Sequence, residues 1–268
     1  MKHAFLIIAH NEFAVLQLLV NMLDDPQVDI YIHFDKKVRP LPTIRTEKSR
    51  LFILNDRIDV KWGSVSQIQT EFLLLGTARE NGPYSHYHII SGTHLPLLPA
   101  KELLAFYHQH SGQEIMRCWK EDPGDADFKI RRIHFPLRWY KSPSTAKRVL
   151  CQRTWSIVIR IQRILQLRIN KKAFFHKTDN WLSLTEKACH YLMAHKKEIL
   201  KKYRWSFCGD EYFVASELYG AKEHFEICDT PKLLYVDFIK DSPRSIPLGE
   251  YDSLKGTGYL WARKFTSQ

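Results

Sequence analysis

His10 and Asp35 are the residues best placed for chemistry near the start of the chain, because each directly follows an apolar stretch of strand length. In a sheet of parallel strands, ligands bind outside the carboxyl ends of the strands, so both side chains would face one ligand. No GxGxxG motif accompanies them, which argues against a dinucleotide and favours a mononucleotide or a sugar nucleotide. Each residue is also compatible with an ordinary turn at a strand end.

The Asp-x-Asp pair formed by Asp125 and Asp127 is a second candidate. Paired carboxylates suit Mg²⁺ or Mn²⁺, and many sugar-nucleotide enzymes bind such a cation. This pair follows no predicted strand, and Pro123 and Gly124 interrupt the stretch just before it. We therefore expect a solvated turn at this point and no metal site.

The elements that must position these side chains alternate between strand and helix patterns. Strands are expected at residues 4–9, 28–34, 51–54 and 87–91, and helices at 12–23, 66–79 and 101–110. The opening strand, helix and strand predict a parallel sheet, so the first half should be a doubly wound α/β structure. Beyond Met116 prolines and glycines loosen the pattern, and a change of topology is expected. Helices are then expected at 145–169, 185–202 and 210–218, and strands at 180–184 and 233–238.

The charge of the chain is concentrated in one segment. The formal net charge is +11, from 40 basic and 29 acidic residues in a chain of 268. Residues 128–178 contain 14 Lys or Arg and no Asp or Glu, which leaves 26 basic and 29 acidic residues elsewhere. With 44% hydrophobic residues, the chain can bury a substantial core, so disorder is excluded as the dominant state.

The cysteines and the first residues bear on the compartment. Five cysteines form no CxxC pair, and an odd number cannot close a complete disulfide set, so a reducing compartment is the simpler interpretation. The apolar run from Ala4 to Ala9 is too short for a signal sequence or a membrane span. We expect a strand there and a cytoplasmic location.

Seven blocks of the sequence carry a family resemblance. In order they are FLIIAHNEFAVLQLLVNML with VDIYIHFDKK, VKWGSVSQIQTEFLLL, YHIISGTHLPLLPAKELLAF, DNWLSLTEKACHYL, GDEYFVASEL, SPRSIPLGEYDSL and ARKF. These blocks resemble the core-2/I-branching enzyme family, glycosyltransferase family fourteen, which contains β-1,6-N-acetylglucosaminyltransferases and peptide O-xylosyltransferases. The match extends over most of the chain, and the chain resembles a short, unanchored, bacterial member of the family. Residues 118 to 177 match poorly, so the identity of the acceptor cannot be inferred from the family.

The resemblance implies a GT-A-like fold: one α/β domain with a Rossmann-type, mostly parallel sheet and helices on both faces. It also implies a UDP-sugar donor, inversion at the anomeric carbon, and no metal or other cofactor. By position it assigns a uridine site (Ile8, His10, Asp35 and Trp62), a catalytic base (Glu211) and a diphosphate site (Arg244 and Lys264). The sequence departs from the family in the block around Pro96, where His94 stands in place of an acidic residue, so His94 is left out of the catalytic set.

The chemistry of an inverting transfer agrees with these assignments. Such a transfer needs a general base for the acceptor hydroxyl and a cation for the departing diphosphate. Glu211 suits the first role, although acidic residues such as Asp210 and Glu211 are also favoured at the N-terminus of any helix. Arg244 and Lys264 suit the second role, and the alternative for each is an ordinary surface cation.

The acid-free segment has three interpretations: a solvated or core-packed helix, a membrane-surface element, or a nucleic-acid patch. Its apolar residues are more numerous than a nucleic-acid-binding arm needs, and Trp155, Phe174 and Phe175 are natural anchors at a membrane interface. The part from Lys147 to Lys172 holds eight basic side chains that an anionic membrane would attract. We therefore favour the membrane interpretation and expect no bound nucleic acid.

The sequence thus predicts a single glycosyltransferase domain over residues 1–268. Within it, 1–117 would form the nucleotide-sugar-binding half, 118–178 a basic variable segment and 179–268 the catalytic and acceptor half. The expected reaction transfers N-acetylglucosamine or xylose from a UDP-sugar in β linkage to a glycan or lipid-linked glycan, for a surface polysaccharide or glycolipid. The enzyme would work at the inner face of the cell membrane. The alternative is a non-catalytic basic protein that binds nucleic acid through residues 129–177.

Overall fold

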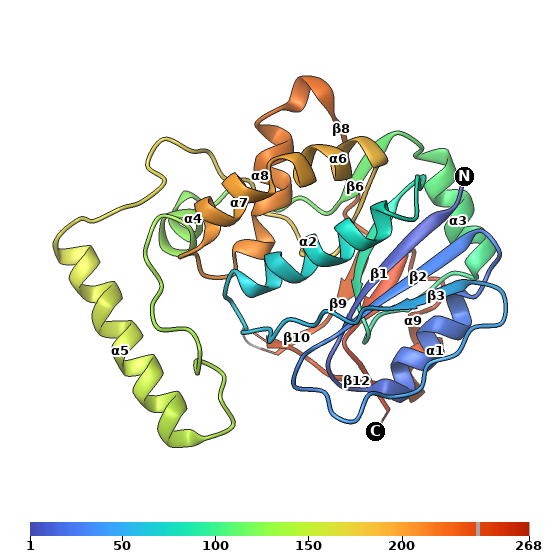
Figure 1. The fold of residues 1–268 in the computed structure, drawn as a ribbon, viewed down its shortest axis with the longest axis horizontal. Coiled ribbons are helices and arrows are strands. Elements are labelled where there is room, and N and C mark those ends of the chain that lie inside the picture. Colours follow the sequence, from blue (N-terminus) through green and yellow to red (C-terminus); the bar gives the residue numbers. More distant parts are fainter. Residues whose placement is uncertain (240–241, 268) are drawn as a thin grey trace.

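A seven-stranded sheet is the centre of the fold in this computed structural model, which describes residues 1–239 and 242–267 (Figure 1). From edge to edge its strands are β3 (Arg50–Ile53), β2 (Val28–Phe34), β1 (His3–Ala9), β4 (Tyr87–Ser91), β7 (Leu182–Leu184), β6 (Gln113–Met116) and β8 (Glu226–Asp229). Neighbouring strands are parallel, except that β7 is antiparallel to both β4 and β6. The expected change of topology beyond Met116 is this antiparallel insertion.

Helices cover both faces of the sheet, because successive side chains of a strand point to opposite faces. One core joins Leu6 of β1 to α2 (Ser66–Arg79), α6 (Glu186–Ala194), α7 (Lys196–Tyr203) and α8 (Phe213–Tyr219). The other joins Phe5 and Ile7 to α1 (Phe13–Leu23) and α3 (Ala100–Gln109). This arrangement confirms the predicted α/β class, with a mostly parallel sheet between two helical layers (Figure 1).

Short strands return the C-terminal part of the chain to the end of β4. A three-stranded sheet holds β5 (Leu95–Pro96), β13 (Trp261–Arg263) and β9 (Leu234–Val236), and two pairs join β10 (Phe238–Ile239) to β11 (Ser242–Pro243) and β12 (Ile246–Pro247) to β14 (Phe265–Thr266). Phe265 N donates to Thr93 O at 3.0 Å, just beyond β4. The helix α9 (Tyr251–Leu254) lies between β12 and β13 in the chain.

Several predicted elements differ from the structure. The helix expected at 185–202 is two helices, α6 and α7, which meet at His195; their apolar positions stay in phase, so the sequence pattern does not mark the break. The helix expected at 210–218 begins instead as a 3₁₀ turn, Gly209–Glu211, before α8. The strand expected at 233–238 is divided between β9 and β10.

The predicted solvated turn around Asp125 and Asp127 is wrong. Residues Pro123–Lys129 form the helix α4, whose N-cap Asp122 accepts hydrogen bonds from Gly124 N at 2.8 Å and Asp125 N at 3.1 Å. An N-cap Asp followed by Pro at the first helical position is a signal for a helix start. The prediction treated the same Pro and Gly as breaks in the chain.

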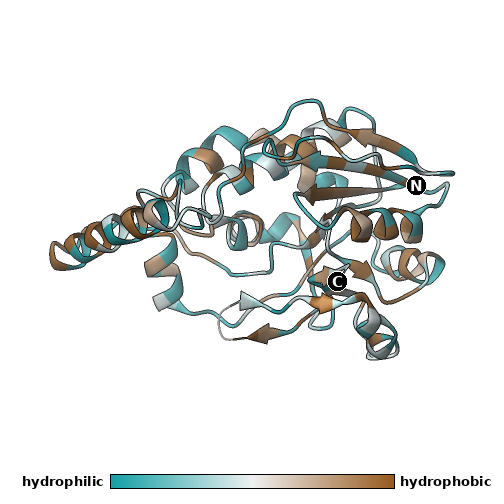
Figure 2. Cartoon of the chain, turned by 90° about the horizontal axis from the view of Figure 1, so that it is seen from below, coloured by the Kyte–Doolittle hydropathy of each residue, from teal (hydrophilic) through white to brown (hydrophobic). Residues whose placement is uncertain are grey.

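The helix α5 (Thr145–Ile164) stands out from the body of the protein, as Figure 2 shows. It ends five residues before its predicted end, and Gln166 and Asn170 adopt left-handed backbone conformations beyond it. In the part of the chain that the structure describes, no helix is both long and apolar enough to cross a membrane.

Candidate active site

The ends of β1 and β2 place His10 and Asp35 side by side at the carboxyl edge of the sheet. Ala9 and Phe34 are paired in register, and Asp35 N donates to Ala9 O at 2.9 Å. Ile8, one residue before Ala9, is partly buried and accepts a hydrogen bond from Gly92 N through its carbonyl at 2.9 Å. The predicted proximity of the first strand-end residues is therefore confirmed.

The carboxylate of Asp35 is already engaged within its own turn. It accepts hydrogen bonds from Lys37 N at 2.8 Å and Lys37 Nζ at 2.7 Å, and the same Nζ lies 3.0 Å from Asp59 Oδ1. Asp35 is buried and Lys37 is exposed. This pairing fits the turn-forming interpretation of Asp35, and it leaves a charged cluster beside His10 where a ligand could exchange partners.

The charge of Lys264 acts on His10 at the carboxyl edge of the sheet. Desolvation first and the Lys264 cation second lower the pKa of His10, while Asp35 opposes the shift. Lys264 O accepts a hydrogen bond from Ile246 N at 2.8 Å, which fixes the backbone of β14 beside β12. The Lys264 ammonium forms no ion pair within the described residues, so its charge is available to an anion.

Trp62 joins the same region through a residue of the basic segment. Lys141 Nζ lies 3.6 Å from the centroid of the Trp62 ring, and Tyr140 stacks on that ring at 5.7 Å. Desolvation and the nearby Lys264 together lower the pKa of Lys141. Lys141 therefore connects Trp62 to the edge that holds His10 and Lys264. Its contact with Trp62 was not predicted from the sequence.

Glu211 sits on a turn that is bonded to the Trp62 loop. Cys208 N donates to Gly63 O at 2.8 Å, and Glu211 N donates to Cys208 O at 3.2 Å. Gly209 is required between them, because a Cβ there would lie 2.3 Å from Ser206 Oγ. The turn is thus fixed by local packing, which holds Glu211 at one position relative to Trp62.

The Glu211 carboxylate is bound on one side and open on the other. Its Oε2 accepts a hydrogen bond from Lys129 Nζ at 2.8 Å and lies 3.7 Å from Lys177 Nζ, whereas Oε1 makes no hydrogen bond within the described residues. The side chain is 32% exposed. Burial by itself would lower the pKa of Lys129, but the carboxylates of Glu211 and Asp125 outweigh burial and raise that pKa. The pairing holds one carboxylate oxygen of Glu211 and leaves the other without a partner among the described residues.

Asp125 supports this pair from α4. Its Oδ2 lies 2.8 Å from Lys177 Nζ and 3.3 Å from Lys129 Nζ, and accepts a hydrogen bond from Tyr212 Oη at 2.6 Å. Asp127 faces away to form ion pairs with Arg132 and Arg168. The two carboxylates therefore hold basic side chains, and no group of three or more His, Cys, Asp or Glu able to hold a metal occurs among the described residues.

Asp210, the neighbour of Glu211, points into the protein. Its Oδ2 accepts a hydrogen bond from Gln67 Nε2 at 2.6 Å, while Oδ1 and the nearby Glu71 Oε1 are buried without a partner in the described part of the chain. Burial first and the Glu211 charge second raise the pKa of Asp210 to about 7. Burial, together with Asp210, also raises the pKa of Glu71 well above its usual range. Two adjacent acids thus have opposite environments, one open and one buried.

Arg244 lies near Lys264 in the fold but its guanidinium is occupied. Its Nε lies 2.5 Å from Asp237 Oδ2, and its two terminal nitrogens lie 2.9 and 2.7 Å from the carboxylate oxygens of Glu250. Arg244 N also donates to Asp237 O at 2.8 Å. A diphosphate would have to displace Asp237 or Glu250 before Arg244 could bind it. These two carboxylate partners were not predicted.

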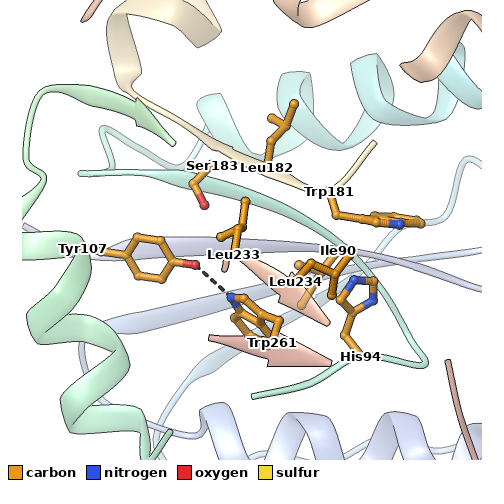
Figure 3. A pocket seen from close by; sticks show the side chains of 9 residues that line it. All are labelled: Ile90, His94, Tyr107, Trp181, Leu182, Ser183, Leu233, Leu234 and Trp261. Atoms are coloured by element: carbon orange, nitrogen blue, oxygen red, sulfur yellow. Dashed lines mark hydrogen bonds between the residues drawn. The ribbon is translucent and has the colours of Figure 1, made fainter. Parts of the chain in front are cut away.

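His94, which was left out of the catalytic set, lies in the interior of the protein. It is fully buried, its Nδ1 accepts a hydrogen bond from Ser91 N at 3.1 Å, and it packs edge-on against Trp181 at 4.9 Å. Burial first and Arg263 second hold its pKa well below the usual range. His94 and Trp181, drawn in Figure 3, line a cavity of about 10 Å³, which has room for no more than a water molecule. A larger hollow of about 440 Å³, near His110 and Lys232, contains none of the predicted site residues.

Arg263 is a further cation at this edge that the sequence analysis missed. It stacks over Trp181 at 5.0 Å, and its Nε is buried without a partner among the described residues. Burial lowers the pKa of Arg263 to about 10, because distant Asp179 compensates only in part. Its neighbour Lys264 was found only through the ARKF block.

The structure therefore forms two groups of site residues. His10, Asp35, Trp62 and Lys264 lie at one carboxyl edge, and Lys129 and Lys177 surround Glu211 on the adjoining turn. No hydrogen bond or ion pair in the described residues links Glu211 to Arg244 or Lys264. The lysines that were not predicted, Lys129, Lys141 and Lys177, all belong to the acid-free segment. Its lack of acidic residues was the available signal, but that signal was interpreted as a property of the protein surface.

Comparison with protein families defines the class of protein as a glycosyltransferase, with which the α/β fold agrees. The model of the Core-2/I-Branching enzyme matches residues 3–245, so the chain belongs to the core-2/I-branching enzyme family. Among solved structures, apo mouse xyloside xylosyltransferase 1 is similar at 10% sequence identity and a TM-score of 0.43, over 98% of this chain and 97% of that chain. The sequence matches none of the curated proteins with which it was compared.

Proposed function

We propose that the protein is an inverting glycosyltransferase that moves a sugar from a UDP-sugar to an acceptor hydroxyl in β linkage, with Glu211 as the general base. The observation that carries the proposal is the environment of Glu211. One carboxylate oxygen is fixed by Lys129 at 2.8 Å, and the other is free to accept a proton. A base must be ionised and within reach of the hydroxyl that it deprotonates.

The proposed reaction is a single displacement at the anomeric carbon. The acceptor oxygen forms a bond to the anomeric carbon while its proton passes to Glu211 Oε1, and the bond from that carbon to the diphosphate oxygen breaks. Attack from the side opposite the leaving group inverts the configuration. The Lys129 ammonium orients the carboxylate, and the turn at Gly209 limits its movement.

The departing UDP gains negative charge, which Lys264 and Arg244 would neutralise without a metal. Lys264 is favoured as the first contact because it has no competing carboxylate among the described residues. Arg244 is favoured as a second contact that exchanges Asp237 and Glu250 for phosphate oxygens, since a guanidinium binds carboxylate and phosphate with the same forked geometry. Arg263, beside Lys264, is a further candidate for this charge.

The remaining parts of the proposal concern the ligands and the place of action. Ile8, His10, Asp35 and Trp62 would contact the uridine, because they line or adjoin the carboxyl edge of the sheet. N-acetylglucosamine or xylose would be the sugar, and a glycan or lipid-linked glycan for a surface polysaccharide or glycolipid would be the acceptor. A cytoplasmic enzyme at the inner face of the membrane fits such an acceptor.

The substitution Glu211→Gln tests the proposal, because it retains size and hydrogen bonding but cannot accept a proton. Release of UDP should fall by roughly 10²- to 10⁴-fold, the contribution typical of general-base catalysis. UDP affinity, measured by calorimetry, should stay within about twofold of the wild type. Glu217→Gln is the matched control, since Glu217 is also bound by a lysine, Lys202, at 2.7 Å. Turnover near the wild-type rate in Glu211→Gln, with normal UDP binding, would place the base elsewhere.

The alternative of a non-catalytic nucleic-acid-binding protein has less support. The chain belongs to a family of glycosyltransferases, and the basic side chains of Lys129, Lys141 and Lys177 are used inside the candidate site. Stabilisation by UDP in a thermal-shift assay without added metal would favour the enzyme, and salt-sensitive RNA binding without any response to UDP would favour the alternative.

A further inference from the structure

The exposed face of α5 is apolar, although the helix is attached to a folded body. Leu150, Ile157, Ile161 and Ile164 are 62%, 58%, 48% and 73% exposed. With 3.6 residues per turn, these four side chains and Leu165 lie within an arc of roughly 100° around the helix axis. Figure 2 shows the helix projecting from the body, where hydrophobic and hydrophilic residues alternate along it.

The opposite face of α5 already has its partners. Cys151, Ile159 and Gln162 are buried there, and Trp155 Nε1 donates to His134 Nδ1 at 3.0 Å. The outer arc is therefore separate from the surface by which the helix packs on the protein. A core-packed helix does not account for it, because five large aliphatic residues remain in solvent.

Basic side chains border this arc on both sides. At helical spacing, Lys147 falls at one border and Arg153 and Arg160 at the other. All three are exposed, and none forms an ion pair within the described residues. The whole segment 128–178 contains no acidic residue that could offset them.

We infer that the outer face of α5 docks on an anionic lipid membrane. A helix that lies in a membrane interface has an apolar face flanked by Lys and Arg, which reach the lipid headgroups while the aliphatic side chains enter the acyl boundary. The arc of α5 meets this description through both its apolar residues and its flanking cations.

An aromatic cluster connects the opposite, packed face of α5 to the candidate active site. Trp155 of α5 packs against Phe207 at 5.8 Å and Tyr140 at 5.2 Å, and Phe207 directly precedes Cys208 in the turn that leads to Glu211. A membrane bound by α5 would therefore lie at a fixed orientation to the catalytic turn. This last consequence rests on the proposed function, whereas membrane docking itself does not.

Co-sedimentation of the full chain with vesicles tests the inference. Vesicles of phosphatidylcholine and phosphatidylglycerol in equal amounts should pellet the protein, and vesicles of phosphatidylcholine alone should not. Each cation at an anionic surface contributes about fivefold in binding, so Lys147→Gln with Arg153→Gln and Arg160→Gln should weaken it on the order of 100-fold. Ile157→Ser with Ile164→Ser should also abolish pelleting at the same protein concentration.

The matched control is Leu41→Ser with Ile53→Ser, which removes two exposed aliphatic side chains far from α5 in the chain. This control should bind vesicles as the wild type does, and thermal unfolding should show that all variants are folded. Equal pelleting with both lipid mixtures, or with neither, overturns the inference. So does a dimer in sedimentation velocity that Ile157→Ser with Ile164→Ser dissociates while vesicle binding is unchanged.

Discussion

The burial of Asp210 beside the proposed base predicts how the stability of the folded protein depends on pH. Asp210 is 5% exposed, and its pKa is raised to about 7 by burial and by the charge of Glu211. The folded protein therefore holds a proton on Asp210 that the unfolded chain, with an ordinary pKa of 3.8, releases much earlier. Between these two values the folded state binds more protons, so stability falls as pH rises. Above about pH 7 no further loss from this group is expected.

The substitution Asp210→Asn should remove this dependence, because an amide imitates the protonated acid and can still accept the hydrogen bond from Gln67. A pKa difference of this size corresponds to about 4 kcal/mol at 1.36 kcal/mol per unit. The variant should therefore gain up to about 4 kcal/mol relative to the wild type between pH 4 and pH 8. Since Glu211 is unaltered and its open oxygen faces solvent, transfer should persist.

Urea unfolding of both proteins at several pH values measures the difference directly, and subtraction cancels the groups that they share. Asp56→Asn, at an exposed position, is the control and should show no such trend. A stability difference between wild type and Asp210→Asn that is constant to about 0.5 kcal/mol from pH 4 to pH 8 would refute the reasoning. It would mean that Asp210 is ionised in the folded protein throughout.

Four further outcomes are expected. Transfer should survive EDTA, because lysine and arginine are proposed to meet the diphosphate charge; loss that manganese restores would contradict this. Asp125→Ala should lower the unfolding free energy by about 1–3 kcal/mol, since it removes partners of two lysines and a tyrosine. Lys264→Met should weaken UDP binding by roughly 10- to 100-fold in calorimetry, and the exposed Lys255→Met should not. His134→Gln should flatten the loss of stability on acidification from pH 6.5 to about 4, because burial lowers the pKa of His134 to about 4 and the unfolded chain takes up the proton first; an unchanged slope in pH-dependent unfolding would exclude His134.

The strands that position the first site residues could be predicted because their signal is local. The apolar runs of β1, β2 and β4 are short, continuous and bounded by polar residues. Runs of this length favour buried strands over helices, which are usually longer. The rule that ligands meet parallel strands at their carboxyl ends then placed His10 and Asp35 together. The helix α4 was also encoded locally, by Asp122 and Pro123, but the same residues are common in turns.

The environment of Glu211 could not be predicted, because it depends on contacts between distant parts of the chain. Lys129 precedes Glu211 by 82 residues, and the turn at Gly63 that fixes Cys208 lies farther still. Nothing in the spacing of Asp210 and Glu211 shows that one acid is buried and the other open. That difference arises only when α2, with Gln67 and Glu71, packs under the turn.

The sequence by itself determined the family, the α/β class and the basic segment, because each depends on residue order or local composition. Only the tertiary structure decided how those charges are used. Lys129 and Lys177 pair with carboxylates of the candidate site and Lys141 lies over the Trp62 ring, whereas Lys147, Arg153 and Arg160 remain on the outer border of α5. The sequence does not show which way a charged side chain points. Packing decides this, because a cation becomes buried only where a carboxylate or an aromatic ring compensates for the hydration that it loses.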